Sequence, residues 1–385
     1  MKIKRPYLPF IPIILGGFNV NYSFIFYFLK YKIYSFKNQP VFFFIFLIQA
    51  ILSLLFSILF INPVNGDINS QIVSFYSYIS VGFLLIIKLP FNINDVFRGL
   101  QFITVLYSIY AVSIFLIDPD LNILNYAYSK IKMREFVPGW PQRYPLMVAI
   151  SFVYVLSNSN KNKVDYLSLL ILFACILITF TRSLYLSVII PSILIGIKTY
   201  LKSFTIFIKK FRINGSILFP PLILVGIIFF LTSSENSIQM LLENTYLSIK
   251  GMIIDRNSIV PIRSGSSEGM RIYHWIASFN IFLQYPLFGT GFRGIYQFSD
   301  MGSTHSQYFD VLLRTGLTGF AIHIYLYLNI YRKYKHNYSY ITQIILCLLI
   351  FGIFNESIKQ IFTAVFIFLL NNKSVVSNSS IVAIE

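Results

Sequence analysis

One histidine stands in a polar stretch of the C-terminal third of the sequence. His305 lies in "MGSTHSQYFD", directly before an apolar run that begins near residue 312. A neutral imidazole can accept a proton from a hydroxyl group near neutral pH, so His305 is a candidate general base. The alternative is a surface histidine without a chemical role.

Glycines lie on both sides of this histidine. The stretch "PLFGTGF" at 286–292 contains Gly289 and Gly291, and such a turn lets the backbone approach a ligand closely. Gly316 follows His305 after ten residues, where a small residue permits close contact between helices. We expect these three glycines to have a structural role beside His305.

Arginines form a second group with chemical potential. Guanidinium donors fork across two oxygens and keep their charge, so they suit a diphosphate. Arg182 interrupts a long apolar stretch, which is costly unless it faces a polar cavity or the interface. The alternatives are a snorkelling turn residue for Arg182 and lipid headgroup contact for Arg271. Further candidates for phosphate binding are Arg143 and Arg293, and candidate accessory residues are Arg314, Asp310 and Glu268.

The stretch "RIYHWIASFNIFLQY" begins at Arg271 and places apolar side chains on one helical face. Pro286 follows it and is expected to end the helix. The pattern predicts a short amphipathic helix lying against the membrane surface, with His274 at the interface.

The composition indicates a membrane protein. Of the 385 residues, 56% are hydrophobic and only 12% are charged, whereas about a quarter are charged in a soluble domain. Hydrocarbon offers no partner to free backbone groups, so helices are the expected spanning elements. We predict an all-α, polytopic protein with about eleven or twelve spanning helices. The expected spans are 8–29 (one helix or a tight pair), 41–61, 71–90, 100–117, 144–158, 164–181, 183–201, 216–232, 312–331, 341–354 and 358–371.

The positive charge predicts an orientation. The net charge of +17 comes from short basic clusters between apolar runs, which favours the positive-inside rule over nucleic-acid binding. The clusters at 160–163, 209–214 and 332–336 are expected in the cytoplasm. Alternation then places the following segments outside: 62–70, 118–143, 181–183 and 233–311. We expect an N-terminal helical part (1–232), a large outer loop before the last three helices (233–311), and C-terminal helices with a tail (312–385).

Several kinds of site are not indicated. The sequence has no phosphate-cradling loop of the nucleotide type, and no His, Cys and Asp cluster has metal-ligand spacing. Cys175 and Cys347 both lie in apolar runs, where a disulfide is not expected. We predict neither a metal nor a cofactor. The inner loops are too short for a domain that uses nucleotide sugars, so a sugar donor would have to arrive on a lipid at the outer face.

The ordered features resemble the O-antigen polymerase and O-antigen ligase superfamily. The elements are Arg271, Trp275, "PLFGTGF", His305 and Gly316, all within or beside the outer loop. The family also tends to have an arginine and a serine between two earlier helices, and "TFTRSLYLS" supplies Arg182 and Ser183 there.

The resemblance implies a bacterial plasma-membrane glycosyltransferase with its site on the periplasmic, extracytoplasmic face. It would polymerise oligosaccharide repeats carried on undecaprenyl diphosphate, for the O-antigen of lipopolysaccharide or for capsule. His305 would activate a sugar hydroxyl, and Arg182 and Arg271 would bind the diphosphate. Candidate partners are lipid-linked oligosaccharides, the bilayer and a chain-length regulator. The alternatives are a ligase that transfers finished polymer to lipid A-core, and a flippase that does no chemistry.

Overall fold

In the computed structural model, residues 93–122, 126–137, 140, 143–158, 161–207, 267–291, 304–335, 338 and 340–355 are described, with single positions within 44–55 and 367–371. These residues form eight helices with defined bounds, and no described residue lies in a strand. The all-α expectation is confirmed for this part of the chain. The helices are α5 (Ile93–Ile117), α6 (Tyr126–Phe136), α7 (Arg143–Ser157), α8 (Lys163–Ile178), α9 (Arg182–Phe207), α12 (Ser267–Gln284), α13 (Gln307–Tyr334) and α14 (Tyr340–Phe354).

The described helix boundaries follow local signals in the sequence. Asn162 caps α8 by accepting from the Asp165 backbone N–H, and the Asp165 side chain accepts from Asn162 N–H in return. The predicted amphipathic helix is α12, and it ends just before Pro286. The short helix α6 was not predicted; it lies in the expected outer segment 118–143. The expected spans 8–29, 71–90 and 216–232 lie outside the described residues, as do most of 41–61 and 358–371.

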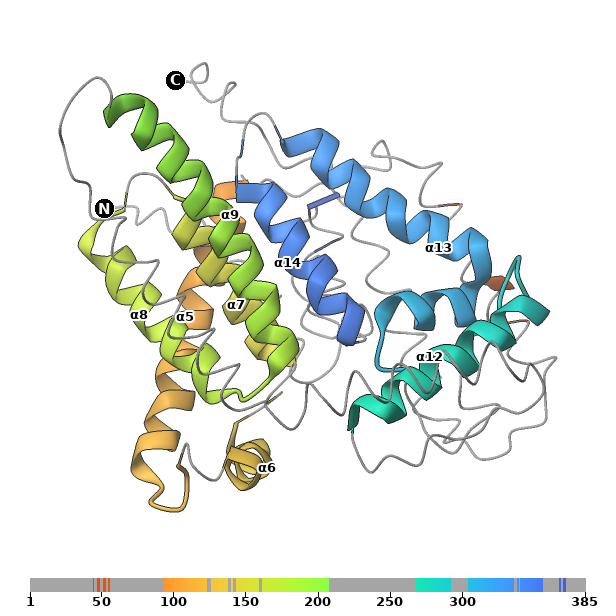
Figure 1. Ribbon diagram of the computed structural model, residues 1–385, viewed down its shortest axis with the longest axis horizontal. Helices are drawn as coiled ribbons and strands as arrows, with labels where there is room; N and C mark the ends of the chain where they lie inside the picture. Colours follow the sequence, from red (N-terminus) through yellow and green to blue (C-terminus); the bar gives the residue numbers. More distant parts are fainter. Residues whose placement is uncertain are drawn as a thin grey trace, which may run out of the picture.

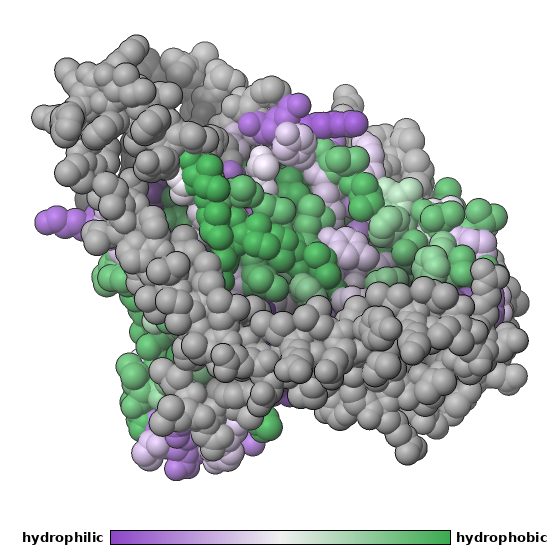
Figure 2. Space-filling model, in the orientation of Figure 1, coloured by the Kyte–Doolittle hydropathy of each residue, from purple (hydrophilic) through white to green (hydrophobic). Residues whose placement is uncertain are grey.

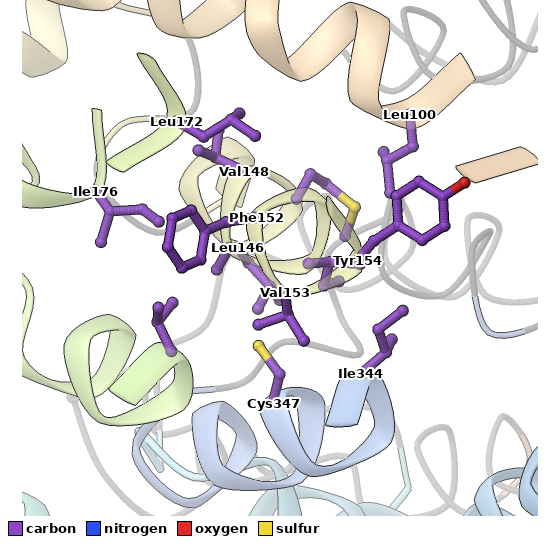
Figure 3. Packing of buried hydrophobic residues seen from close by; sticks show 14 of the residues in the cluster. Leu100, Leu146, Val148, Phe152, Val153, Tyr154, Leu172, Ile176, Ile344 and Cys347 are labelled. Carbon is purple, nitrogen blue, oxygen red and sulfur yellow. The ribbon is translucent and has the colours of Figure 1, made fainter. Parts of the chain in front are cut away.

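Helix α7 forms the centre of the main helical group. Every residue from Tyr144 to Leu156 is buried. Val148 and Phe152 point toward α8, and Val153 points toward Cys347 of α14 (Figure 3). Helices α5, α8, α9 and α14 surround α7, as Figure 1 shows. An apolar helix buried all round is typical of the core of a large helical bundle.

The termini of these helices lie at two opposite ends of the helical group. At one end, Gln101 donates to Asp165 at 3.3 Å, and Tyr340 donates to Asn94 at 2.8 Å. This end, which we call the basic end, carries the predicted clusters at 160–163 and 332–336. At the other end lie the turn between α8 and α9, the last residues of α14 and the start of α13 (Figure 1). We call this the Arg182 end.

Helix α13 is broken at Gly316, whose backbone is left-handed with φ 63° and ψ −163°. Residues sixteen apart would be about 24 Å apart in a straight helix, yet Gln307 Nε2 lies 2.6 Å from His323 Nε2. The first part, 307–315, therefore folds back on the second part, 317–334 (Figure 1). We call these the returning segment and the long segment. The predicted span 312–331 is thus wrong in its beginning, because residues 312–315 precede the break.

By length and composition, two described helices could cross a membrane, Val96–Ile117 and Gln307–Tyr334, and the second of these ranges includes both segments of the broken α13. Shorter apolar helices are Tyr144–Ser157, Arg182–Ile197 and Tyr340–Phe354. Large apolar side chains are exposed along the outer faces of α5, α8 and α9, among them Leu106, Leu170 and Leu194. Figure 2 shows an apolar band on the visible face, with hydrophilic residues near the upper end of α13 and below α5. Such a band suits contact with lipid tails.

Candidate functional site

The turn between α8 and α9 presents Arg182 as the first residue of α9. Phe180 has a left-handed backbone with φ 49°, which is uncommon for a residue other than glycine. Lys130 of α6 donates from Nζ to the Phe180 carbonyl oxygen at 3.2 Å. Hydroxyl groups add to the turn, because Thr181 donates to the Thr179 carbonyl oxygen at 3.0 Å. Arg182 is half-buried and is the first residue of α9. The turn before it is stabilised by its own threonine side chains and by Lys130 of α6.

The beginning of α9 is tied to the end of α14. Asn355 Nδ2 donates to Ser183 Oγ at 2.6 Å, and both side chains are buried. Phe354 lies beside Asn355, and its ring centroid is 6.2 Å from that of Trp275 on α12. The start of α9 is thus connected through α14 to the middle of α12.

Trp275 also connects α12 to the returning segment. Its ring stacks on Phe309 with centroids 5.6 Å apart and an interplanar angle of 19°. Arg271, half-buried, lies four residues before Trp275, so both residues occupy the same face of α12. The predicted residues Arg182 and Arg271 therefore both lie at the Arg182 end.

His305 lies immediately before the N-cap residue of α13, Ser306. Its side chain is exposed and its backbone is left-handed with φ 53°. This conformation costs an L-residue on the order of 1–3 kcal/mol, and strained positions of this kind cluster at functional sites. The His274 ring on α12 lies 6.3 Å from the His305 ring, and His274 is only 1% exposed. The expectation that His274 lies at the membrane interface is therefore wrong.

The glycine loop, Pro286–Gly291, fills the break in α13. Thr290 and Gly291 donate their backbone N–H groups to the carbonyl oxygens of Leu313 and Arg314, at 2.7 and 2.9 Å. In return, the backbone N–H groups of Leu317 and Thr318 donate to Pro286 and Leu287, at 2.8 and 3.3 Å. In an unbroken helix Leu317 and Thr318 would donate to Leu313 and Arg314. The loop thus provides donors for the two carbonyl oxygens before the break and acceptors for the two backbone N–H groups after it.

Residues 167–324 match the family model described as O-antigen ligase. This segment covers less than half of the chain, and the family is the one that the ordered sequence features resemble. A comparison with curated proteins finds no match. The superfamily segment contains α9, α12, the glycine loop and the break in α13, and it includes Arg182, Arg271, His305 and Gly316.

An ion pair lies inside the returning segment. Arg314 Nε donates to both carboxylate oxygens of Asp310, at 2.9 and 3.0 Å, and both side chains are buried. Asp310 and Arg314 were both candidate accessory residues, and the structure places them in contact with each other, before the break in α13. The pair adds no net charge at this position.

Three predicted residues have no described side chain. Arg143 is the first residue of α7 and Glu268 is the second residue of α12. Arg293 lies outside the described residues. Among the described residues, no group of three His, Cys, Asp or Glu side chains could hold a metal ion.

The sequence alone did not indicate two contributions to this candidate site. Lys130 lies in the expected outer segment 118–143, and only the presence of α6 brings it to Phe180. Ser183 was noted as a neighbour of Arg182, but its buried partner Asn355 was not noted. An asparagine directly after the apolar run 341–354 is the signal that could have indicated Asn355, because buried amides need partners.

Proposed function

We propose that this protein is a membrane glycosyltransferase that polymerises oligosaccharide repeats linked to a lipid diphosphate, undecaprenyl diphosphate by resemblance. The family supports a protein that acts on lipid-linked oligosaccharides in a bacterial inner membrane. The observation that supports this proposal most strongly is a series of contacts at the Arg182 end. Ser183 at the start of α9 contacts Asn355 at the end of α14. Next to Asn355, Phe354 contacts Trp275 of α12, whose ring stacks on Phe309 near the start of α13. The same end holds Arg182, Arg271 and His305.

In the proposed reaction, the growing chain on its lipid diphosphate is the donor. The terminal sugar hydroxyl of an incoming lipid-linked repeat attacks the anomeric carbon of the donor. The bond between that carbon and the phosphate oxygen breaks, and the lipid diphosphate leaves with the bonding electrons. The hydroxyl proton passes to the neutral His305 imidazole. Arg182 and Arg271 stabilise the negative charge of the leaving group.

The proposed orientation places the Arg182 end on the extracytoplasmic face. The basic end carries the clusters at 160–163 and 332–336, and the positive-inside rule assigns such clusters to the cytoplasm. Helices α5, α7, α8, α9 and α14 run between the two ends, so five described helices agree with the predicted alternation. In this proposal the expected span 216–232 leads back from the cytoplasm to the outer loop 233–311, which ends within the returning segment.

Purified protein tests the reaction with synthetic lipid-diphosphate-linked repeats. We expect a ladder of longer lipid-linked products, and we expect His305→Ala or Arg271→Ala to abolish it at equal protein level. Arg332→Ala is the matched control, because Arg332 is an exposed arginine in the last turn of α13, at the basic end. A full ladder from His305→Ala would contradict the role of the imidazole.

The ligase is the second candidate, because the match to a family model described as O-antigen ligase is compatible with both reactions. The two reactions differ in their acceptor. A polymerase extends lipid-linked repeats without any other acceptor, whereas a ligase transfers polymer only when lipid A-core is supplied. In cells, loss of a polymerase leaves single repeats on the core, and loss of a ligase leaves full chains on the carrier lipid. A flippase would turn over neither substrate chemically.

A further inference from the structure

We propose that Gln307, His323 and Tyr327 form a polar clamp that positions the returning segment, and with it His305, for the reaction. The positioning role rests on the proposed function. The clamp itself rests on the fold of α13.

The three side chains meet across the break in α13. Gln307 Nε2 lies 2.6 Å from His323 Nε2 and donates to the Tyr327 hydroxyl at 3.1 Å. The His323 and Tyr327 rings meet edge to face with centroids 5.0 Å apart. All three residues are buried. These contacts join the first residue of the returning segment to the middle of the long segment.

The clamp pairs a side-chain amide with an imidazole. One of the two groups donates and the other accepts, and the orientation of the amide determines which role His323 Nε2 takes. A buried amide that loses its acceptor bears the full cost of its desolvation, and an apolar side chain at 323 would impose that cost. Helix α14 closes the clamp from the side, because a Cβ on Gly352 would lie 3.4 Å from Gln307 Cδ.

The returning segment is held at two places. At its C-terminal end, the glycine loop binds the carbonyl oxygens of Leu313 and Arg314. At its N-terminal end, Ser306 makes no side-chain capping hydrogen bond. The Gln307 side chain ties this end to the long segment, two residues after His305. Tyr308 adds a hydrogen bond from its hydroxyl to the Leu349 carbonyl oxygen of α14 at 2.7 Å. Loss of the clamp should therefore loosen the N-terminal end of the segment against the long segment, while its C-terminal end stays bound to the glycine loop.

The test compares His323→Phe, His323→Gln and Tyr327→Phe with the control Tyr331→Phe, in which an exposed ring on the same helix loses its hydroxyl. Hydrogen exchange of the 307–315 amides is measured in the full chain in lipid nanodiscs, alongside kcat and KM for the lipid-linked acceptor. We expect His323→Phe to speed exchange in this segment about tenfold or more and to lower kcat with little change in KM. His323→Gln, whose carbonyl oxygen can accept from Gln307, should restore part of both.

Tyr327→Phe removes one acceptor and should give a smaller change, and it keeps the test open if His323→Phe does not fold. Wild-type exchange in His323→Phe would overturn the clamp. Faster exchange spread evenly over all helices would also overturn it, because that result indicates general destabilisation. Faster local exchange with unchanged kcat would overturn the positioning role. A wild-type protein without turnover would refute the proposed function, while the exchange pattern would still decide the clamp.

Discussion

Gly289 and Gly316 lie back to back where the glycine loop crosses the break in α13. A Cβ on Gly289 would lie 2.6 Å from the Gly316 backbone nitrogen, and a Cβ on Gly316 would lie 2.5 Å from the Leu287 carbonyl carbon. Both glycines also have left-handed backbones, with φ 69° and 63°. The two glycine features of the sequence are therefore two halves of one junction.

We expect Gly289→Ala and Gly316→Ala to destabilise the protein and abolish polymer formation. Each adds a methyl group where backbone atoms already lie, and each places an L-residue in a conformation that costs roughly 1–2 kcal/mol. Thermal unfolding in detergent and product ladders measure the effect. Gly196→Ala is the matched control, because nothing lies within 4 Å of its added Cβ. Wild-type stability of Gly316→Ala would contradict the junction.

We expect Asp310 and Arg314 to depend on each other. Removing one partner by Arg314→Met or Asp310→Asn changes the charge of a buried site and should cost about 3–5 kcal/mol. The double variant should lose clearly less free energy of unfolding than the two single variants lose together, because it leaves no uncompensated buried charge. Denaturant unfolding of the four proteins measures this coupling. Strict additivity would show that the pair does not interact.

Lys130→Met should weaken donor binding. Its ammonium group holds the Phe180 carbonyl oxygen in the turn that precedes Arg182, and losing a hydrogen bond from a charged group should raise KM for the lipid-linked donor about tenfold. Lys132→Met, two residues along α6, is the control, because Lys132 binds Asp118 and Asp120. Equal effects of both variants on KM would contradict a specific role for Lys130.

The Asp118–Lys132 pair predicts a pH effect on stability. The hydrogen bond from Lys132 lowers the pKa of Asp118 below its usual 3.8. A carboxyl group whose pKa is lower in the folded state binds a proton less readily in the folded protein than in the unfolded one. It therefore stabilises the folded protein at pH values above its unfolded-state pKa, and this stabilisation is lost as the pH falls through its folded-state pKa. Thermal unfolding between pH 6 and pH 2.5 should therefore show a smaller acid-induced loss in Lys132→Met. An unchanged pH profile would contradict this assignment.

Cysteine labelling tests the proposed orientation. Cys175 and Cys347 are fully buried, so they contribute little background. Glu135 is an exposed residue of α6 at the Arg182 end, and Lys335 is exposed at the basic end. A membrane-impermeant maleimide should label Glu135→Cys in intact cells and Lys335→Cys only after the membrane is opened. The opposite pattern would place the Arg182 end in the cytoplasm.

Hydrophobic runs and helix-ending residues predicted much of the described fold. The apolar runs placed α7, α8 and α14 to within three residues, and they placed the start of α9 to within one residue but its end six residues too early. Pro286 correctly ended α12. Helix α6 escaped because it is polar, and its helix is held by contacts such as the Tyr110 hydroxyl to the Phe136 carbonyl oxygen. The fold-back of α13 escaped because its apolar run continues across Gly316.

The candidate site was less predictable than the helices. Arg182, Arg271 and His305 could be proposed from their setting, and the structure puts their helix ends together. The burial of His274 and the contact between Lys130 and Phe180 depend on helices distant in sequence. A single sequence carries no local signal for such contacts, because packing between elements decides them.

The hydrogen bonds of the glycine loop have a consequence for the tolerance of this region to substitution. Backbone peptide groups supply both donors and acceptors where the loop crosses the break, so most neighbouring side chains do not determine whether the two segments can meet. Side chains around the crossing can therefore be exchanged, and the surface that they form can change, while the two positions that lack a Cβ preserve the backbone junction.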